Sequence, residues 1–381
     1  MNTGDVNTGG VNARPEPSGP NSATPKRILF ATDAWRPQIN GVVKTLEALL
    51  RELNARGVAT EIIEPGEFRT VPTPSYPEIR LAFAWAHRIA ARHDAFRPDH
   101  VHVETEGPIG WAMRKLCLRR GLPFTTSYHT RLPEYLRARA PVPVGATYAL
   151  LRRLHNSGAG VMVPTGSMAR ELEGRGFRNI MRCGRGADLA LFNPAAPTGV
   201  DLSRLPRPIF LSVARLAPEK NLDAFLSLDL PGSKVMVGDG PDGERLRARH
   251  PGAVFLGALA HDQLAGIYAQ ADVFVFPSLT DTFGLVLVEA LACGLPVAAF
   301  PAPGPLDVIG QSGAGVLGED LRAAALAALD IDRGLCRRHA LGFGWDKVAD
   351  QFLANIAAAR AMREAGPAGA GAHSTERPVI G

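Results

Sequence analysis

Two carboxylates eight positions apart, Asp281 and Glu289, lie on either side of a predicted helix start. A β-rich run, Asp272 to Phe276, ends at Pro277, and the helix is expected to begin near Gly284. The unpaired backbone N–H groups of such a helix start attract anions, most often phosphate. A carboxylate one to two turns further in suits a neutral, hydroxyl-bearing group such as a ribose. An ordinary buried strand–loop–helix unit, with one acid as a cap and the other solvated, fits this segment equally well.

Two basic residues follow the first strand expected in the second half of the chain. In the segment SVARLAPEKNL, Arg215 and Lys220 come after the apolar run Ile209–Val213. Arginine can hold a diphosphate by a bidentate fork and lysine as a point charge. A surface pair partnered by Glu219 is the alternative. We favour the diphosphate interpretation because this loop and the helix start at Gly284 are expected to face one cleft.

The first half of the chain carries further candidates at predicted strand ends. In the loop TDAWRPQINGVVKT, Gly41 starts the following helix with Asn40 as its cap, and a glycine there lets a ligand approach the backbone closely. His129, after the fourth strand, could hydrogen-bond a substrate hydroxyl, with Glu104 and Glu106 beside it. Polar residues at strand ends also cap loops, so a purely structural role stays open for all of these.

Other motifs are formal matches without supporting context. The segment Gly238–Gly243 satisfies GxGxxG, but it follows the second strand of its half, and the next strand supplies no acid for an adenosine ribose. We interpret it as a turn, and it is the sole support for a nicotinamide-dependent oxidoreductase. His100 and His102 share one strand face without a third ligand nearby, so no metal site is expected.

Apolar β-rich runs alternate with helical segments through both halves of the chain, which predicts βαβ units and parallel sheets. The expected fold is α/β, with two Rossmann-like doubly wound domains that face each other across a cleft. The predicted division is a disordered leader 1–25, a first domain 26–188, a linker 189–208, a second domain 209–344, a helix 345–365 that crosses back to the first domain, and a disordered tail 366–381.

The composition points to a cytoplasmic globular protein. The 381 residues are 46% hydrophobic and 21% charged, and no apolar run approaches the roughly 20 residues that span a bilayer. The first 25 residues lack the apolar centre of a signal peptide. Four cysteines without CxxC spacing indicate reduced thiols: Cys117, Cys183, Cys293 and Cys336.

Basic residues are concentrated between positions 111 and 156. This segment carries nine lysines and arginines against one acid, Glu134, in a chain whose net charge is +5. Apolar residues are interleaved with the basic ones, which fits peripheral docking on an anionic membrane at about 1 kcal/mol per basic residue. No nucleic-acid motif accompanies the charge, so nucleic acid is not an expected partner. A solvated arginine-rich face is the alternative.

Taken together, these segments resemble the retaining nucleotide-sugar glycosyltransferases of family 4, which have the GT-B fold. PSLTDTFGLVLVEALACGLPV is similar to the E-x7-E segment of that family, with Asp281 in place of the first glutamate. SVARLAPEKNL resembles its diphosphate site and VGDGPDGERL its second-strand turn. RPQINGVVKT, HVHVETEGPIG and SYHTRLPEYL resemble its first-domain loops, especially in the subgroup of sulfolipid synthases and other lipid or mannosyl transferases.

The resemblance implies a role for each candidate residue. The leaving diphosphate would meet the cations and the backbone N–H groups of the helix start, Glu289 would bind the ribose, and the strand end near Leu259 would line the base. Asp281 and His129 would contact the donor sugar. No metal and no cofactor would be needed. The residues implied are Arg215, Lys220, Phe283, Gly284 and Leu285 for the diphosphate, and Gly41 for close approach of the diphosphate or sugar.

The implied reaction transfers a hexosyl unit from a UDP- or GDP-linked sugar to a membrane lipid, with diacylglycerol as the first expectation. The alternative is a GDP-mannose-dependent α-mannosyltransferase that acts on a phosphoinositol, polyprenyl-linked or polysaccharide acceptor. Either activity would place the protein in the cytoplasm or at the inner face of the cytoplasmic membrane. The shorter carboxylate at Asp281 leaves the donor sugar open.

Overall fold

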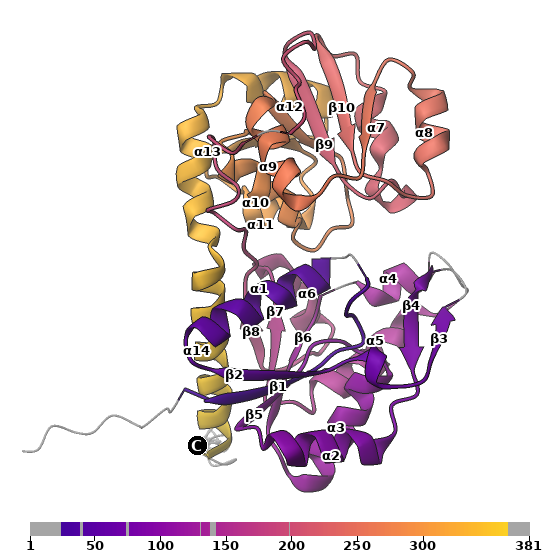
Figure 1. The fold of residues 1–381 in the computed structure, drawn as a ribbon, viewed down its shortest axis with the longest axis vertical. Helices are drawn as coiled ribbons and strands as arrows, with labels where there is room; N and C mark the ends of the chain where they lie inside the picture. The colour runs from indigo at the N-terminus through magenta and orange to yellow at the C-terminus, as the bar shows by residue number, and fades with distance from the viewer. Residues whose placement is uncertain are drawn as a thin grey trace, which may run out of the picture.

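The computed structural model describes residues 24–38, 41–73, 76–129, 131–137, 142–197 and 199–364. In these ranges the strands form two six-stranded parallel sheets and one separate hairpin (Figure 1). The two α/β units confirm the predicted fold class. Asn40, the predicted helix cap, lies outside the described residues, as do nearly all of the leader and the whole of the tail 366–381.

The first sheet has the strand order β2-β1-β5-β6-β7-β8. Its central strands are buried, as expected where helices cover both faces of a parallel sheet, although β5 and β6 carry buried histidine, threonine and serine side chains. The strands are β1 (Arg27–Ala31), β2 (Ala59–Ile63), β5 (His100–Val103), β6 (Phe124–Ser127), β7 (Gly160–Val163) and β8 (Ile180–Arg182). The helices are α1 (Gly41–Ala55), α2 (Ala86–Phe96), α3 (Pro108–Arg120), α4 (Leu132–Arg137), α5 (Val144–His155) and α6 (Gly166–Gly174).

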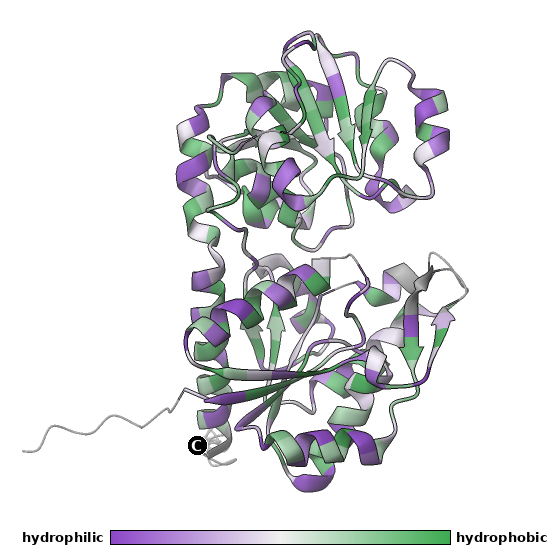
Figure 2. Ribbon diagram, in the orientation of Figure 1, coloured by the Kyte–Doolittle hydropathy of each residue, from purple (hydrophilic) through white to green (hydrophobic). Residues whose placement is uncertain are grey.

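The second sheet repeats this plan with the order β11-β10-β9-β12-β13-β14. Its strands are β9 (Ile209–Val213), β10 (Ser233–Val237), β11 (Val254–Gly257), β12 (Val273–Phe276), β13 (Val297–Ala299) and β14 (Gly315–Leu317). Its helices are α7 (Leu222–Leu226), α8 (Gly243–Arg249), α9 (His261–Gln270), α10 (Leu285–Ala292), α11 (Pro303–Val308), α12 (Leu321–Ala327) and α13 (Arg333–Ala340). In Figure 2 the strands of the second unit are largely hydrophobic, whereas those of the first unit combine hydrophobic and hydrophilic segments.

The long last helix, α14 (Trp345–Glu364), packs on the first domain. Its buried residues Trp345, Phe352 and Ile356 share one core with Ile28 and Phe30 of β1. In Figure 1 this helix continues from the α13 side of the second unit and runs along one side of the first. No helix within the described ranges has the length and apolarity needed to cross a membrane.

Candidate active site

The loop between β12 and α10 ends in a residue with left-handed backbone angles, a conformation that favours glycine. Gly284 has φ 83°, and the helix begins at the next residue. Phe283 is 6% exposed and packs in the hydrophobic core of the second domain, which fixes the position of this turn. α10 is apolar and its first turn carries no acid, so its N-terminal N–H groups keep their positive partial charge. The helix start thus offers donors to an anion.

A charged pair stands before that helix start. Lys220, at the end of the short 3-10 turn Pro218–Lys220, lies with its Nζ 2.6 Å from Oδ1 of Asp281. Both side chains are about one quarter exposed, at 24% and 22%. The other carboxylate oxygen of Asp281, Oδ2, is buried and accepts no hydrogen bond from the part of the chain described here. Arg215, five residues before the lysine, is exposed on the same loop.

The starts of helices α1 and α10 meet between the two domains. A methyl group placed on Gly41 would lie 3.9 Å from Cδ1 of Leu285, with no other atom among its close neighbours in the described residues. Leu285 packs against the cores of both domains. Next to it, the hydroxyl of Thr282 donates to the carbonyl oxygen of His129 at 3.0 Å. The structure therefore brings the loops of Gly41, His129 and Asp281 together at one interdomain boundary.

Glu289 is held inside the second domain by two side chains of α9. It is 4% exposed, and the hydroxyl of the fully buried Tyr268 donates to its Oε2 at 3.1 Å. Nε2 of His261 lies 3.1 Å from its Oε1. Burial and the nearby carboxylate raise the pKa of Tyr268 far above its ordinary value, so the phenol stays a donor. Leu259, predicted to line the base, is half-buried just before α9.

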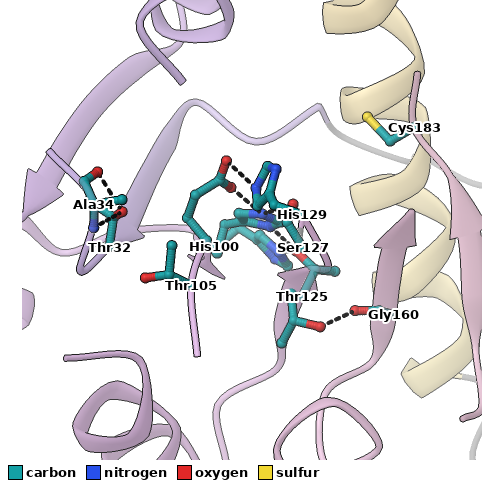
Figure 3. A network of polar contacts seen from close by, with 12 residues as sticks. Thr32, Ala34, His100, Thr105, Thr125, Ser127, His129, Gly160 and Cys183 are labelled. Carbon is teal, nitrogen blue, oxygen red and sulfur yellow. Dashed lines mark hydrogen bonds and ion pairs between the residues drawn. The ribbon is translucent and has the colours of Figure 1, made fainter. Parts of the chain in front are cut away.

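His129 faces into its own domain, where it joins a buried polar network (Figure 3). Its Nε2 lies 2.7 Å from Oε1 of Glu104, and its Nδ1 accepts from Nη2 of Arg185 at 2.8 Å. Glu104 also lies 3.0 Å from Nε2 of His102, and Thr125 bridges His102 to His100. The ring nitrogens of His129 are thus engaged within the first domain, while its carbonyl oxygen faces the second.

The charges in this network compensate each other. Burial raises the pKa of Glu104, but the neighbouring His129 and His102 outweigh it and hold that pKa well below its ordinary value. The carboxylate is therefore ionised beside the buried guanidinium of Arg185, which is 7% exposed and also donates to the carbonyl oxygens of Cys183 and Gly184. Arg185 is not among the residues predicted from the sequence, because it lies in the segment CGRGADL after a strand of three residues, which is too short to show a periodic pattern.

A second missed residue, Asp33, caps helix α3 from the end of β1. Its carboxylate accepts from the backbone N–H groups of Ile109 at 2.9 Å and Gly110 at 3.3 Å, and from the hydroxyl of Thr105 at 3.1 Å. Burial raises the pKa of Asp33 to about 6, against the opposing effect of those hydrogen bonds. Two features of the sequence could have indicated this cap. One is an aspartate in the loop directly after β1, and the other is Pro108 at the first position of a helix elsewhere in the same domain.

The raised pKa of Asp33 predicts a stability effect with a definite sign. Between the ordinary value of 3.8 and about 6 the folded protein binds more protons than the unfolded chain, so this group loses stabilising free energy as pH rises through that window. The unfolding free energy of Asp33→Asn minus that of wild type should therefore increase by about 2 kcal/mol from pH 4 to pH 7. This amount is reduced for solvent screening because the carboxyl is half-buried. Urea unfolding at both pH values measures this difference, and a constant difference would contradict the assignment.

The glycines of the formal GxGxxG segment serve packing in this structure. A Cβ on Gly238 would lie 1.9 Å from the carbonyl oxygen of Ala214, and one on Gly240 would lie 2.5 Å from that of Leu216. Both positions have positive φ, at 136° and 158°. The second-strand turn therefore needs glycines to pack against the loop that carries Arg215.

Several basic side chains of the segment 111–156 have partners inside the protein. Arg114 donates to Ser157, Arg120 pairs with Asp94, Arg131 with Glu171, and Arg152 donates to the carbonyl oxygen of Arg175. Lys115, Leu118 and Arg119 on α3 are exposed. Arg139 lies outside the described residues.

Comparisons with known proteins identify the family of this fold and site. The profile of glycosyl transferases group 1 matches residues 201–332, and that of glycosyltransferase family 4 matches residues 39–191. The GDP-mannose-dependent alpha-mannosyltransferase of Mycobacterium tuberculosis is 32% identical over 88% of this chain and 98% of its own length. The chain belongs to glycosyltransferase family 4. It is therefore a glycosyltransferase with a nucleotide-sugar donor.

Further relatives are a sulfoquinovosyl transferase and a monoglucosyldiacylglycerol synthase. The sulfoquinovosyl transferase of Arabidopsis thaliana is 31% identical over 77% of this chain and 63% of its own length. The alpha-monoglucosyldiacylglycerol synthase of Streptococcus pneumoniae is 26% identical over 80% of this chain and 78% of its own. Among solved structures, a sucrose-phosphate synthase from Thermosynechococcus elongatus matches with a TM-score of 0.72 at 19% identity, over 89% of this chain and 99% of that one, which supports the GT-B fold.

Proposed function

We propose that this protein transfers a hexosyl unit from a UDP- or GDP-linked sugar to a membrane lipid of the diacylglycerol type, with retention of configuration and without a metal ion. The observation that carries the proposal is the Lys220–Asp281 pair at the start of α10, opposite Gly41. It combines a cation and helix N–H groups for a diphosphate with a carboxylate for a sugar. The Streptococcus relative, a monoglucosyldiacylglycerol synthase, supports a lipid acceptor.

In the proposed donor complex, each charged group meets a different part of the nucleotide sugar. Arg215 and Lys220 neutralise the diphosphate, and the N–H groups of Phe283, Gly284 and Leu285 add donors along the helix dipole. Glu289 accepts from the ribose hydroxyls. The Oδ2 atom of Asp281, which is buried without a hydrogen bond within the described residues, accepts from a hydroxyl of the donor sugar.

The chemistry then rests on stabilising the leaving group. As the anomeric carbon develops oxocarbenium character, negative charge grows on the departing phosphate oxygen, which lies against the two cations and the helix start. That oxygen also takes the proton of the acceptor hydroxyl on the same face of the sugar. Since these fixed positive groups take the place of a metal ion, a chelator should leave turnover unchanged.

The M. tuberculosis relative favours a second candidate, GDP-mannose-dependent α-mannosyl transfer. The two candidates differ in base and sugar, so thermal unfolding across a panel of UDP- and GDP-linked hexoses separates them. A cognate donor at 100 times its dissociation constant adds about 2.7 kcal/mol to the stability of the folded protein. If none of the nucleotide sugars stabilised the protein, both candidates would be contradicted. Release of free nucleotide that depends on added diacylglycerol would identify the acceptor.

Replacement of Tyr268 by phenylalanine tests the placement of Glu289. Without the phenol, the carboxylate loses one of its two fixed partners and about 1 kcal/mol of donor binding, which raises the KM for the donor roughly fivefold at nearly constant kcat. The preference for a ribonucleotide over its 2′-deoxy analogue should weaken in parallel. Tyr148→Phe, which removes a phenol remote from the ribose contacts, is the matched control. An unchanged preference in the Tyr268 variant would count against a positioning role.

A further inference from the structure

The separate hairpin β3–β4 exposes large apolar residues to solvent and buries a small one, the reverse of the usual arrangement in a sheet. β3 (Thr70–Thr73) pairs antiparallel with β4 (Tyr76–Ala82), and Val71 stands directly opposite Leu81. Both are exposed, at 44% and 41%, whereas the neighbouring Ala82 is 5% exposed. The small residue therefore faces the core, and the large ones face outward.

This outward apolar face continues beyond the hairpin. The N–H of Phe83 bonds the carbonyl oxygen of Arg69, which extends the pairing by one residue, and Phe83 is 51% exposed. Ala84 packs against the first-domain core, and Trp85, just before α2, is 55% exposed. We call Val71, Leu81, Phe83 and Trp85 the hairpin ridge. A row of large exposed side chains marks an interaction site more often than scattered ones do.

The exposed charged side chains that the structure describes around the hairpin ridge are basic. Of the side chains that the structure describes between 69 and 88, the exposed ionisable ones are all basic: Arg69, Arg80, His87 and Arg88. Arg80 donates to Thr70 and Arg88 to the carbonyl oxygen of Glu67, so neither of these bonds neutralises its charge. Arginines beside tryptophan, phenylalanine and leucine suit the anionic, half-apolar boundary of a bilayer.

The ridge also adjoins the basic segment 111–156. β4 contacts helix α3, on which Lys115, Leu118 and Arg119 are exposed. The hairpin thus supplies large apolar groups for insertion beside the basic residues of α3, which supply long-range attraction. A protein partner would gain nothing from this excess of positive charge unless its own surface were acidic, whereas an anionic lipid surface matches both features.

We propose that the hairpin ridge inserts into the interface of an anionic membrane and so holds the first domain at the bilayer surface. The inference rests on the proposed lipid acceptor, because it places the acceptor domain where that lipid resides. Phe83 and Trp85 supply the insertion energy, and Arg69, Arg80 and Arg88 make it depend on lipid charge. Binding therefore weakens at high salt, but less than for a purely basic patch.

Flotation with acceptor-free vesicles of phosphatidylglycerol and phosphatidylcholine tests the hairpin ridge apart from catalysis. Phe83→Ser/Trp85→Ser should bind these vesicles at least tenfold more weakly than wild type. Arg69→Gln/Arg88→Gln should lose the preference for phosphatidylglycerol. The control Leu329→Ser/Leu341→Ser removes two exposed leucines of the second domain, 37% and 46% exposed, and should bind like wild type.

Two further readouts distinguish the outcomes. Thermal stabilisation by the donor nucleotide should be the same in all variants, and its failure in wild type would count against the proposed function rather than against the ridge. The fluorescence of wild type should shift to shorter wavelength on vesicles, and that of Trp85→Phe much less. The proposal would be overturned if the Phe83→Ser/Trp85→Ser variant floated with vesicles as well as wild type does. It would also be overturned if this variant had a lower molar mass in solution than wild type, because the ridge would then bind a second copy of the chain.

Discussion

Lys220→Ala is expected to lower kcat/KM by about 30- to 1000-fold, and Arg215→Ala by a similar amount. This corresponds to about 2–4 kcal/mol in the barrier, the scale for loss of one preorganised charge partner of a leaving group. In the lysine variant the carboxylate of Asp281 also loses the cation 2.6 Å away, so negative charge faces the diphosphate. Steady-state release of nucleotide from the cognate donor measures the effect.

Two other lysine variants serve as comparisons for Lys220→Ala. Lys220→Arg keeps the charge and should recover part of the rate, whereas Lys347→Ala, which removes an exposed lysine bonded to the carbonyl oxygen of Leu341, should leave it unchanged. Asp281→Asn should weaken turnover while the affinity for the free nucleotide diphosphate stays or rises. If both the Arg215 and Lys220 alanine variants turned over at the wild-type rate, the diphosphate would have to bind elsewhere.

Glu104→Ala is expected to lower the free energy of unfolding by about 3–5 kcal/mol. The substitution leaves the buried guanidinium of Arg185 without the charge that compensates it, and an unpaired buried charge carries this scale of cost. Because the pKa of Glu104 lies below its ordinary value of 4.5, the contribution is complete above that pH and declines as the pH falls below it. Urea denaturation at pH 7 and at pH 4 should therefore give a smaller difference at the lower pH.

Glu47→Ala provides a control for the Glu104 experiment. Glu47 pairs with the largely exposed Arg36 on the surface, a type of ion pair that contributes about 0–1 kcal/mol. Equal losses in both variants would mean that the buried network adds no special stability. A double variant, Glu104→Ala/Arg185→Met, should recover part of the loss, since it removes the uncompensated charge.

Strand positions in the two sheets could be predicted wherever the strands are long and apolar. The runs predicted at 209–213 and 272–276 match β9 and, within one residue, β12. β8 and β14 have three residues each, too few for a period to emerge. The hairpin was missed because Val71 and Leu81 point outward and Ala82 inward, which reverses the pattern that indicates a half-buried strand.

The site divides in a similar way between what a sequence reveals and what it does not. The proximity of Lys220 and Asp281 follows from strand order, since β9 and β12 are neighbours and both loops leave the same sheet edge. The orientation of His129 does not follow, because it depends on Arg185, 56 residues away, and on Glu104 from another strand. The partners of Glu289 lie on α9, whose sequence looks like an ordinary amphipathic helix.

The position of α14 determines which fragments and chimeras of this protein are expected to fold. Trp345, Val348, Phe352 and Ile356 complete the core that β1 and α1 begin, although more than 280 residues separate these parts of the sequence. A fragment cut after the first sheet would therefore expose that core and would not be expected to form a stable unit. Chimeras that exchange donor halves between relatives should move residues 209–344 as an insert and retain the final helix with its original N-terminal partner.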